Sequence, residues 1–290
     1  MSINFMQNPF KVFKKHLSWI LREIFLEPFT IRRFSIFFIK YFKIGSYEAR
    51  LSYGAVDRPH YGYCIKQAVK LATSLGYDRI SVLEFGVAGG RGILYLEYHA
   101  KEIEKIYNIK IDIYGFDTGY GLPEPKGYRD LPYIWKKGFF EMNHYRLNQR
   151  IKRTQLILGE ISETISSFVK EYNPAPIGAM FYDMDYYSST SSSLKIFNND
   201  EKYFLPRIFS YFDDTIGDEA SLYNEFTGER LAINEFNMNK TDIKIAKPHY
   251  FHHKSFSQKW YYQIWLVHLF KHKDYNKYIS FDNKQMNLRV

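Results

Sequence analysis

Cysteine is nearly absent from this chain, which has one in 290 residues, Cys64. A single thiol excludes an intramolecular disulfide framework and makes the reducing cytoplasm the expected compartment. Long hydrophobic runs are missing as well. The longest near the N-terminus, residues 34–39, falls far short of the roughly 20 residues that span a bilayer. Lys11, Lys14 and Lys15 stand where the apolar core of a secretory signal would lie, so we expect no such signal.

Aromatic residues are abundant, with 26 Tyr, 25 Phe and 4 Trp, and a hydrophobic fraction of 46% is ample for a packed core. The net charge of +9 is concentrated at the two ends of the chain. Residues 1–50 have nine basic and three acidic side chains, and residues 250–290 have seven and two. The ends therefore carry +6 and +5, and the middle carries −2. Basic, aromatic ends suggest an anionic neighbour such as phosphate or a membrane surface.

Residues 10–43 have the periodicity of two amphipathic helices that are broken near Pro28. In the second half, Phe34, Phe37, Phe38 and Phe42 recur at helical spacing. Two interpretations stay open. The helices form a lid that packs its aromatic face on the body of the protein, or they lie in a membrane interface with Lys and Arg at the headgroups. We place the domain boundary near residue 50, which separates an N-terminal extension (1–50) from a main domain (51–290).

Beyond Asp57, short apolar runs alternate with helical patterns. Strands are expected over 80–85, 111–116, 155–158, 177–182 and 207–212, with 243–246 and 262–269 closing the sheet. Helices are expected over 61–75, 93–106, 163–171, 188–197 and 228–236. This alternation predicts an α/β, Rossmann-like fold with a mainly parallel sheet and helices on both faces. The Gly/Pro-rich segment 117–140 is expected to be a long connection.

Acidic residues lie at the ends of five successive expected strands. They are Glu84, Asp117, Glu160, Asp183 with Asp185, and Asp213 with Asp214. The carboxyl ends of parallel strands share one edge of the sheet, and ligands of open α/β sheets bind beyond that edge. We therefore predict one shared site, the alternative being that these acids are ordinary caps and turns.

A glycine-rich loop, residues 86–92, follows the first of these strands. Its glycines let a ligand approach the backbone at the start of a helix, where free N–H groups favour anions. The spacing is not the G-x-G-x-x-G of dinucleotide enzymes, which disfavours a dehydrogenase. Glu84, just before the loop, suits a cationic or amino-bearing ligand better than a pyrophosphate. Asp117 is placed to accept hydrogen bonds from a ribose diol.

The segment Leu83-Glu-Phe-Gly-Val-Ala-Gly-Gly-Arg-Gly92 resembles the first motif of class I S-adenosylmethionine-dependent methyltransferases. Four later segments resemble the TylF (macrocin) O-methyltransferase family, whose members act on sugars of natural products. These are residues 115–124, 158–164, 181–190 and 212–215. The five segments occur in the family's order over about residues 80–215, and the flanks 1–55 and 240–290 are not covered.

The resemblance implies a class I methyltransferase fold and a role for individual residues. S-adenosylmethionine would lie with its methionine end along Glu84, Gly86, Val87, Ala88 and Gly90. Asp117 would hold the ribose with Thr118 beside it, and Glu160 would lie near the adenine. Asp183, Asp213 and Asp214 would hold Mg²⁺, and Asp183 or Asp185 would accept the substrate proton.

The chemistry of these residue types agrees with such roles. A sugar hydroxyl is a poor nucleophile until its proton is removed, and a hard cation beside a carboxylate promotes that removal. Several neighbouring aspartates repel one another unless a cation, solvation or raised pKa values relieve them. Thr215 stands where the family has Tyr, and residues 198–204 are an insertion, so a different substrate is expected.

We predict a cytoplasmic, Mg²⁺-assisted, S-adenosylmethionine-dependent O-methyltransferase that acts on a hydroxyl of a sugar or glycosylated small molecule. The alternatives are a non-catalytic S-adenosylmethionine-binding protein that docks on a membrane enzyme, and a methyltransferase of nucleic acid. The second is disfavoured because the Asn/Asp-Pro-Pro-Tyr type of motif is absent. Peripheral contact of the N-terminus with the inner membrane face is a further interpretation. Glu229, Arg230 and Glu235 could bind substrate or form a surface ion-pair network. The acceptor and homo-oligomerisation stay open.

Overall fold

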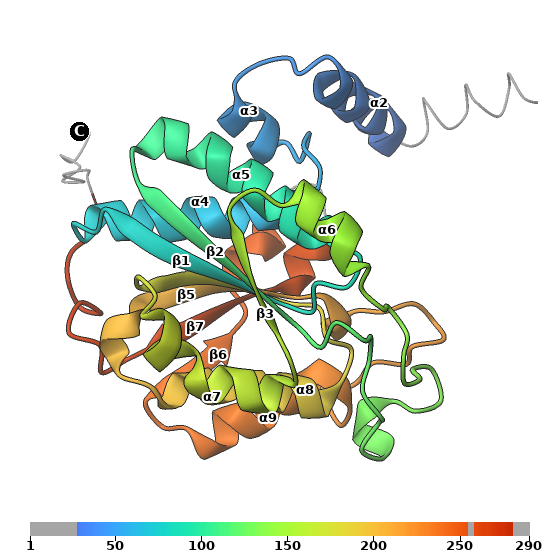
Figure 1. Cartoon of the computed structure of the whole chain (residues 1–290). Coiled ribbons are helices and arrows are strands. Elements are labelled where there is room, and N and C mark those ends of the chain that lie inside the picture. Colours follow the sequence, from blue (N-terminus) through green and yellow to red (C-terminus); the bar gives the residue numbers. More distant parts are fainter. Residues whose placement is uncertain (1–27, 255–257, 281–290) are drawn as a thin grey trace, which may run out of the picture. The chain divides into compact units, whose positions relative to one another are not determined.

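The computed structural model describes residues 28–254 and 258–280 (Figure 1). The chain divides into two compact units, Met1–Pro59 and His60–Val290. The predicted boundary near residue 50 lies a short way before this division. The first of the two expected N-terminal helices falls outside the described residues.

The described part of the N-terminal unit contains two helices, α2 (Pro28–Tyr41) and α3 (Tyr47–Ser52). Pro28 is the first residue of α2, a position where its missing N–H costs no hydrogen bond. Ser46 caps α3, since its hydroxyl accepts a hydrogen bond from Ala49 N at 3.2 Å. Among the residues that the structure describes, no helix is both long enough and apolar enough to span a bilayer.

The second unit is built around a seven-stranded sheet in the order β3-β2-β1-β4-β5-β7-β6. Strands β1 to β5 pair in parallel, and β7 runs antiparallel to both of its neighbours. The bounds are β1 (Arg79–Phe85), β2 (Lys110–Asp117), β3 (Thr154–Leu158), β4 (Ile177–Tyr182), β5 (Phe204–Phe212), β6 (Ile243–Ala246) and β7 (Ile264–Leu269). Every strand that the sequence predicts is present, which confirms the Rossmann-like α/β fold.

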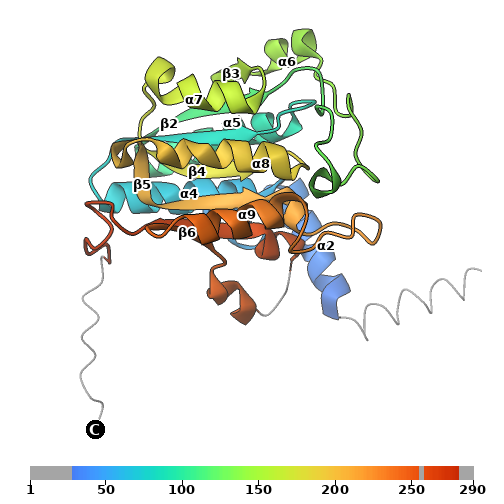
Figure 2. The same ribbon diagram turned by 90° about the horizontal axis from the view of Figure 1, so that it is seen from below.

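Helices cover both faces of this sheet. Helices α4 (Pro59–Ser74) and α5 (Arg91–Tyr107) lie on one face (Figure 1). On the other face, α7 (Ile161–Tyr172), α8 (Tyr187–Ser193) and α9 (Gly228–Asn239) lie side by side (Figure 2). Two short helices were not predicted, α3 and α6 (His144–Arg150). Single turns of 3₁₀ helix occur at 128–130, 194–198, 201–203, 213–215, 249–253 and 259–263.

A row of aromatic rings crosses the sheet just below the carboxyl ends of four strands. Phe116, Phe85, Tyr182 and Phe212 occupy matching register positions on β2, β1, β4 and β5. Neighbouring ring centroids are 5.0, 5.0 and 4.1 Å apart, and the rings of Tyr182 and Phe212 stack almost parallel, with an interplanar angle of 2°. All four side chains are at most 2% exposed. Offset aromatic stacking adds to the free energy of burial, so this row fixes the relative positions of the four strand ends.

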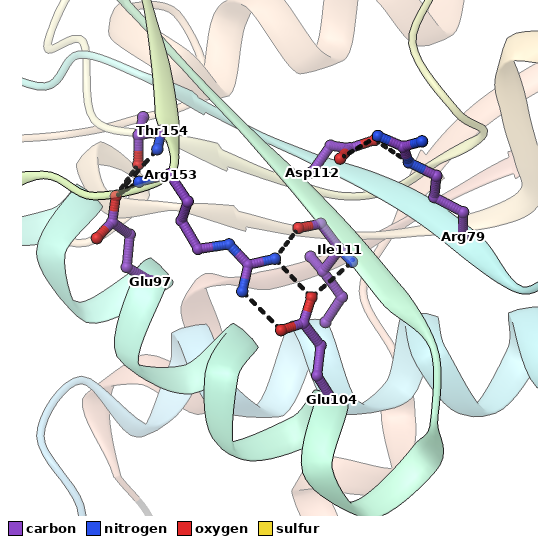
Figure 3. A network of polar contacts seen from close by, with 7 residues as sticks. All are labelled: Arg79, Glu97, Glu104, Ile111, Asp112, Arg153 and Thr154. Atoms are coloured by element: carbon purple, nitrogen blue, oxygen red, sulfur yellow. Dashed lines mark hydrogen bonds and ion pairs between the residues drawn. The ribbon is translucent and has the colours of Figure 1, made fainter.

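A polar network fastens the edge strand β3 to helix α5 (Figure 3). The Arg153 guanidinium donates to Glu104 Oε2 at 2.6 Å and also contacts Glu104 Oε1 and the carbonyl oxygen of Ile111. Glu104 Oε1 accepts from Ile111 N at 2.9 Å. About two turns earlier on α5, Glu97 accepts hydrogen bonds from the backbone N–H groups at the start of β3, at 2.9 Å from Arg153 N and 3.0 Å from Thr154 N.

Replacing Arg153 by Met is expected to lower the free energy of unfolding by about 1–2 kcal/mol, because Glu104 loses a bidentate, partly buried partner. Thermal unfolding measures the loss. Arg79→Met is the matched control, since Arg79 makes a similar bidentate pair with Asp112 but its side chain is 55% exposed. That variant is expected to lose about 0.5 kcal/mol or less. Equal losses in the two variants would contradict the anchoring role of Arg153.

Candidate active site

The predicted acids gather because of the strand order. The chain passes from β1 to β2 and β3 on one side and to β4 and β5 on the other, so the order reverses between β1 and β4. Such a reversal opens a crevice beyond the carboxyl ends of the strands. Asp117 ends β2, Asp183 follows β4 and Asp213 follows β5. Glu160 lies further out, as the residue before α7 beyond the edge strand β3.

The glycine loop after β1 is shaped by close backbone packing. Gly86 has φ +87°, and a Cβ added to it would lie 1.8 Å from the carbonyl oxygen of Asp183. Gly90, at φ +80°, is the residue before α5. Ala88, at φ +47°, adopts the same left-handed region without being glycine. Gly89 differs from its neighbours, since nothing lies within 4 Å of an added Cβ. The loop therefore offers open backbone at Gly89 and is tightly held at Gly86.

Asp117 binds the glycine loop directly. Its Oδ2 accepts hydrogen bonds from Val87 N at 2.9 Å and Ala88 N at 2.8 Å, and its Oδ1 accepts from Gly119 N at 2.6 Å. A carboxylate has about four acceptor positions, so one is left for a ligand hydroxyl. Thr118 folds the following turn, with its hydroxyl donating to Gly121 O at 2.6 Å. Binding of the ribose hydroxyls by Asp117 stays a prediction.

Glu84 lies behind the loop. It is 1% exposed, and its Oε1 accepts a hydrogen bond from the Tyr61 hydroxyl at 2.7 Å. A Cβ added to Gly92 would lie 1.8 Å from the same oxygen. The carboxylate is thus packed under the first turn of α5, and Gly92 is required by this close approach. Contact of Glu84 with the cofactor's methionine end stays a prediction.

Helix α6 covers part of the loop, which the sequence did not indicate. Leu147 is 3% exposed, and its Cδ1 would lie 2.2 Å from a Cβ on Gly90. The His144 ring packs in the same way on Gly119, where Nε2 would be 2.5 Å from an added Cβ. The available signal was Asn143, whose side chain accepts from Arg146 N at 3.0 Å and caps the helix.

Three buried acids form a chain of hydrogen bonds at the ends of β4 and β5. Asp185 N donates to Asp214 Oδ2 at 2.9 Å, and Asp214 N donates to Glu229 Oε2 at 3.0 Å. The Tyr223 hydroxyl donates to Asp214 Oδ1 at 2.9 Å. Asp185 sits at φ +62°, a strained conformation for a residue with a side chain. Glu229 was predicted only as a substrate-binding or surface residue, yet it is 0% exposed.

Crowding and burial favour the protonated forms of these acids. The pKa of Asp185 is raised by burial and then by the carboxylates of Asp214, Asp183 and Asp213. Burial and Asp213 raise the pKa of Asp214, while its hydrogen bonds lower it. Burial followed by Asp214 raises the pKa of Glu229 well above the ordinary value, and Glu229 Oε1 is a buried atom with no hydrogen-bond partner among the described residues.

Asp213 has hydrogen-bond partners outside this chain of acids. Its Oδ1 accepts hydrogen bonds from the hydroxyl of Tyr211 and from Gln263 Nε2, the latter at 2.9 Å. Asp183, Asp213 and Asp214 supply carboxylate oxygens, the ligand type that a hard cation prefers. Glu229 adds a buried oxygen that has no hydrogen-bond partner among the described residues. Within residues 28–254 and 258–280, however, no three such side chains gather as ligands of one metal ion. The Mg²⁺ site stays a prediction.

Asp130 is a structural residue of the site that the sequence did not single out. It is 0% exposed inside the long connection after β2. Its Oδ1 accepts from Ser188 N and its Oδ2 from the Ser188 hydroxyl and Lys126 N, at 2.8, 2.8 and 2.7 Å. These bonds tie the connection to the first turn of α8, so the expected loop is anchored beside the acids.

Comparison with known proteins identifies solved structures but no family. No protein-family model and no curated protein matches the chain. The calicheamicin methyltransferase CalS11 is 16% identical, with 70% of this chain and 77% of that chain covered and a TM-score of 0.45. The O-methyltransferase NovP is 15% identical, with 62% and 72% covered and a TM-score of 0.43. The plantazolicin methyltransferase BamL is 8% identical, with 73% of this chain and 85% of that chain covered and a TM-score of 0.38.

The fold is Rossmann-like, of the class I methyltransferase kind. The seven-stranded sheet with its one antiparallel strand, β7, is the observation that decides this.

Replacing Gly86 by Ala is expected to lower the free energy of unfolding by about 3 kcal/mol or more, because the new Cβ would collide with Asp183 O and the left-handed φ disfavours a side chain. Thermal or urea unfolding measures the loss. Gly89→Ala is the matched control in the same loop, with open space around the added methyl group, and is expected to change stability by less than about 0.5 kcal/mol. Equal effects would show that the close approach at Gly86 does not constrain the loop.

Replacing Glu229 by Gln is expected to raise the melting temperature increasingly as pH rises from about 5 to 8. The folded-state pKa of Glu229 is raised above the unfolded value of about 4.3, so above that pH only the unfolded chain releases the proton easily. Wild-type stability therefore falls with rising pH, and the neutral amide removes this dependence. Melting curves across the pH range test it. For Glu235→Gln, on the same helix but with a side chain 39% exposed, a pH-independent difference is expected. A pH-independent difference for Glu229→Gln would contradict the assignment.

Proposed function

We propose that this protein is an S-adenosylmethionine-dependent methyltransferase that methylates a hydroxyl of a sugar or glycosylated small molecule. The observation that carries the proposal is that two groups lie together at the carboxyl edge of the sheet. One is the glycine loop held by Asp117, and the other is the chain of acids Asp185, Asp214 and Glu229. The segments that resemble methyltransferase motifs supply the glycine loop, Asp117, Asp185 and Asp214 in the same order, and Glu229 follows them in the chain.

The residues around the glycine loop fit a nucleoside with an amino-acid tail. Asp117 keeps one acceptor position for a ribose hydroxyl, and Gly89 offers backbone that no side chain covers. Leu147 of α6 provides an apolar wall over Gly90. When bound, S-adenosylmethionine supplies the sulfonium methyl group. The protein's own contribution is to position the cofactor and the acceptor, because in-line displacement depends mainly on alignment of the two reactants.

Asp185 and Asp183 have different roles toward the acceptor hydroxyl. Burial and the neighbouring carboxylates raise the pKa of Asp185, which favours a protonated side chain that can donate a hydrogen bond to the acceptor. Asp183, at the end of β4 and half-buried, is the better placed base for the hydroxyl proton. Asp183, Asp213 and Asp214 would also hold Mg²⁺, which would lower the pKa of the acceptor hydroxyl.

The proposal is tested by titration with S-adenosylmethionine and by transfer of a labelled methyl group to a panel of nucleotide-linked sugars. Asp117→Ala is expected to weaken cofactor binding about tenfold or more, because a charge-assisted hydrogen bond and the support of the loop are both lost. Asp183→Asn is expected to keep cofactor affinity and lower turnover by roughly 10²-fold or more.

Asp112→Asn is the matched control for Asp117. It lies on the same strand, away from the carboxyl end, and pairs with Arg79. Cofactor affinity is expected to be unchanged in this variant. Absence of cofactor binding by the wild-type chain would overturn the proposal, and binding without transfer to any sugar would favour a non-catalytic role. Turnover that persists unchanged in a chelator would remove Mg²⁺ from the mechanism.

A further inference from the structure

Helix α2 presents an apolar face that the described part of its own unit does not cover. Ile31, Phe34, Phe38 and Tyr41 recur at three- and four-residue spacing, and Phe37 extends the same face. Their exposed fractions are 55, 55, 52, 71 and 59%. Phe42 and Ile44, directly after the helix, are 61 and 56% exposed. Large apolar side chains exposed in one contiguous group mark an interaction surface.

The rings on this face are packed against each other. Phe37 stacks on Tyr41 and Phe38 on Phe42, with centroids 5.9 and 6.0 Å apart. Tyr41 and Phe42 meet edge to face at 5.0 Å. The aromatic ridge is therefore formed within the helix itself. A partner that covers it has few rotamers to order, which lowers the entropic cost of binding.

The charged residues in the segment that carries the ridge are all basic. Between Pro28 and Ser46 there are four cations and no acid, the cations being Arg32, Arg33, Lys40 and Lys43. On a helix with 100° between residues, the first three fall outside the arc of the five exposed apolar residues, on the side where Ile36 and Ile39 are half-buried. Lys40 forms an ion pair with Asp57 at 2.5 Å. Aromatic and basic residues are thus sorted onto separate sides, as in helices that lie in a membrane interface.

We propose that α2 docks on an anionic lipid surface, with its aromatic ridge below the headgroups and its Arg and Lys side chains among them. The helix has 14 residues and is about 21 Å long, which suits lying in the interface rather than crossing the bilayer. A second copy of the chain is the less favourable occupant, because its own residues 28–46 contain no acid to meet these cations, whereas an anionic lipid surface supplies one. The proposal does not depend on the methyltransferase activity.

The test is sedimentation of the full-length protein with vesicles. Phosphatidylcholine vesicles that contain roughly a third phosphatidylglycerol are compared with pure phosphatidylcholine, since interfacial cations respond to anionic lipid. Binding is expected only with the anionic vesicles and is expected to weaken with added salt. The double variant Phe37→Ser/Phe38→Ser is expected to bind about tenfold more weakly or worse, because it loses buried aromatic area.

Two matched controls distinguish binding through α2 from nonspecific adsorption of the protein to lipid. Met238→Ser/Ile106→Ser removes two apolar side chains that are 81 and 43% exposed in the other unit and is expected to bind like wild type. Arg33→Gln/Lys43→Gln is expected to weaken binding, and Lys101→Gln/Lys110→Gln is not. Equal binding to neutral vesicles, equal loss in the apolar control, or no wild-type binding overturns the proposal. Self-association in analytical ultracentrifugation that the Phe variant abolishes, without vesicle binding, assigns the ridge to a second copy.

Discussion

The stacked aromatic row on β2, β1, β4 and β5 is the contact on which the site depends. Each ring is the last or nearly the last residue of its strand, and the functional residues follow within one or two positions. Gly86 follows Phe85, Asp117 follows Phe116, Asp183 follows Tyr182 and Asp213 follows Phe212. Because the rings pack together below the edge of the sheet, they set the separations of the groups above them, and hydrogen bonds such as those from the glycine loop to Asp117 then complete the site.

The stability that this row contributes also explains how the fold accommodates the buried acids. Asp185, Asp214 and Glu229 are buried beside one another, an arrangement that opposes folding when the groups ionise. Backbone N–H groups offset part of that cost, since Asp185 N and Asp214 N each donate to the next acid along. A local cost that the surrounding core outweighs is typical of a reactive site, where proton affinity matters more than stability.

The sequence predicts the sheet well because each strand is a short run of apolar residues with a clear stop. It also predicts that Asp117, Asp183 and Asp213 share an edge, since strand ends are readable from the apolar pattern. It does not reveal that Asp117 binds the loop rather than only a ligand, because that bond joins residues 30 positions apart. In the sequence, Glu229 has the pattern of a surface residue at the start of a helix. In the structure it is buried, because α9 packs beneath Asp214. Helix α6 was missed because its seven residues are too few for a periodic signal.

The antiparallel strand β7 has one practical consequence. It leads the chain away from the acids to the amino-terminal edge of the sheet, where His272 Nε2 lies 3.0 Å from Phe204 O and Arg207 donates to Tyr275 O at 2.6 Å. Tyr278, 76% exposed, follows on that side. The chain's single native thiol, Cys64, is buried. A cysteine introduced at Tyr278 would therefore give one accessible point for a fluorophore or a solid support, remote from the crevice where reactants would enter.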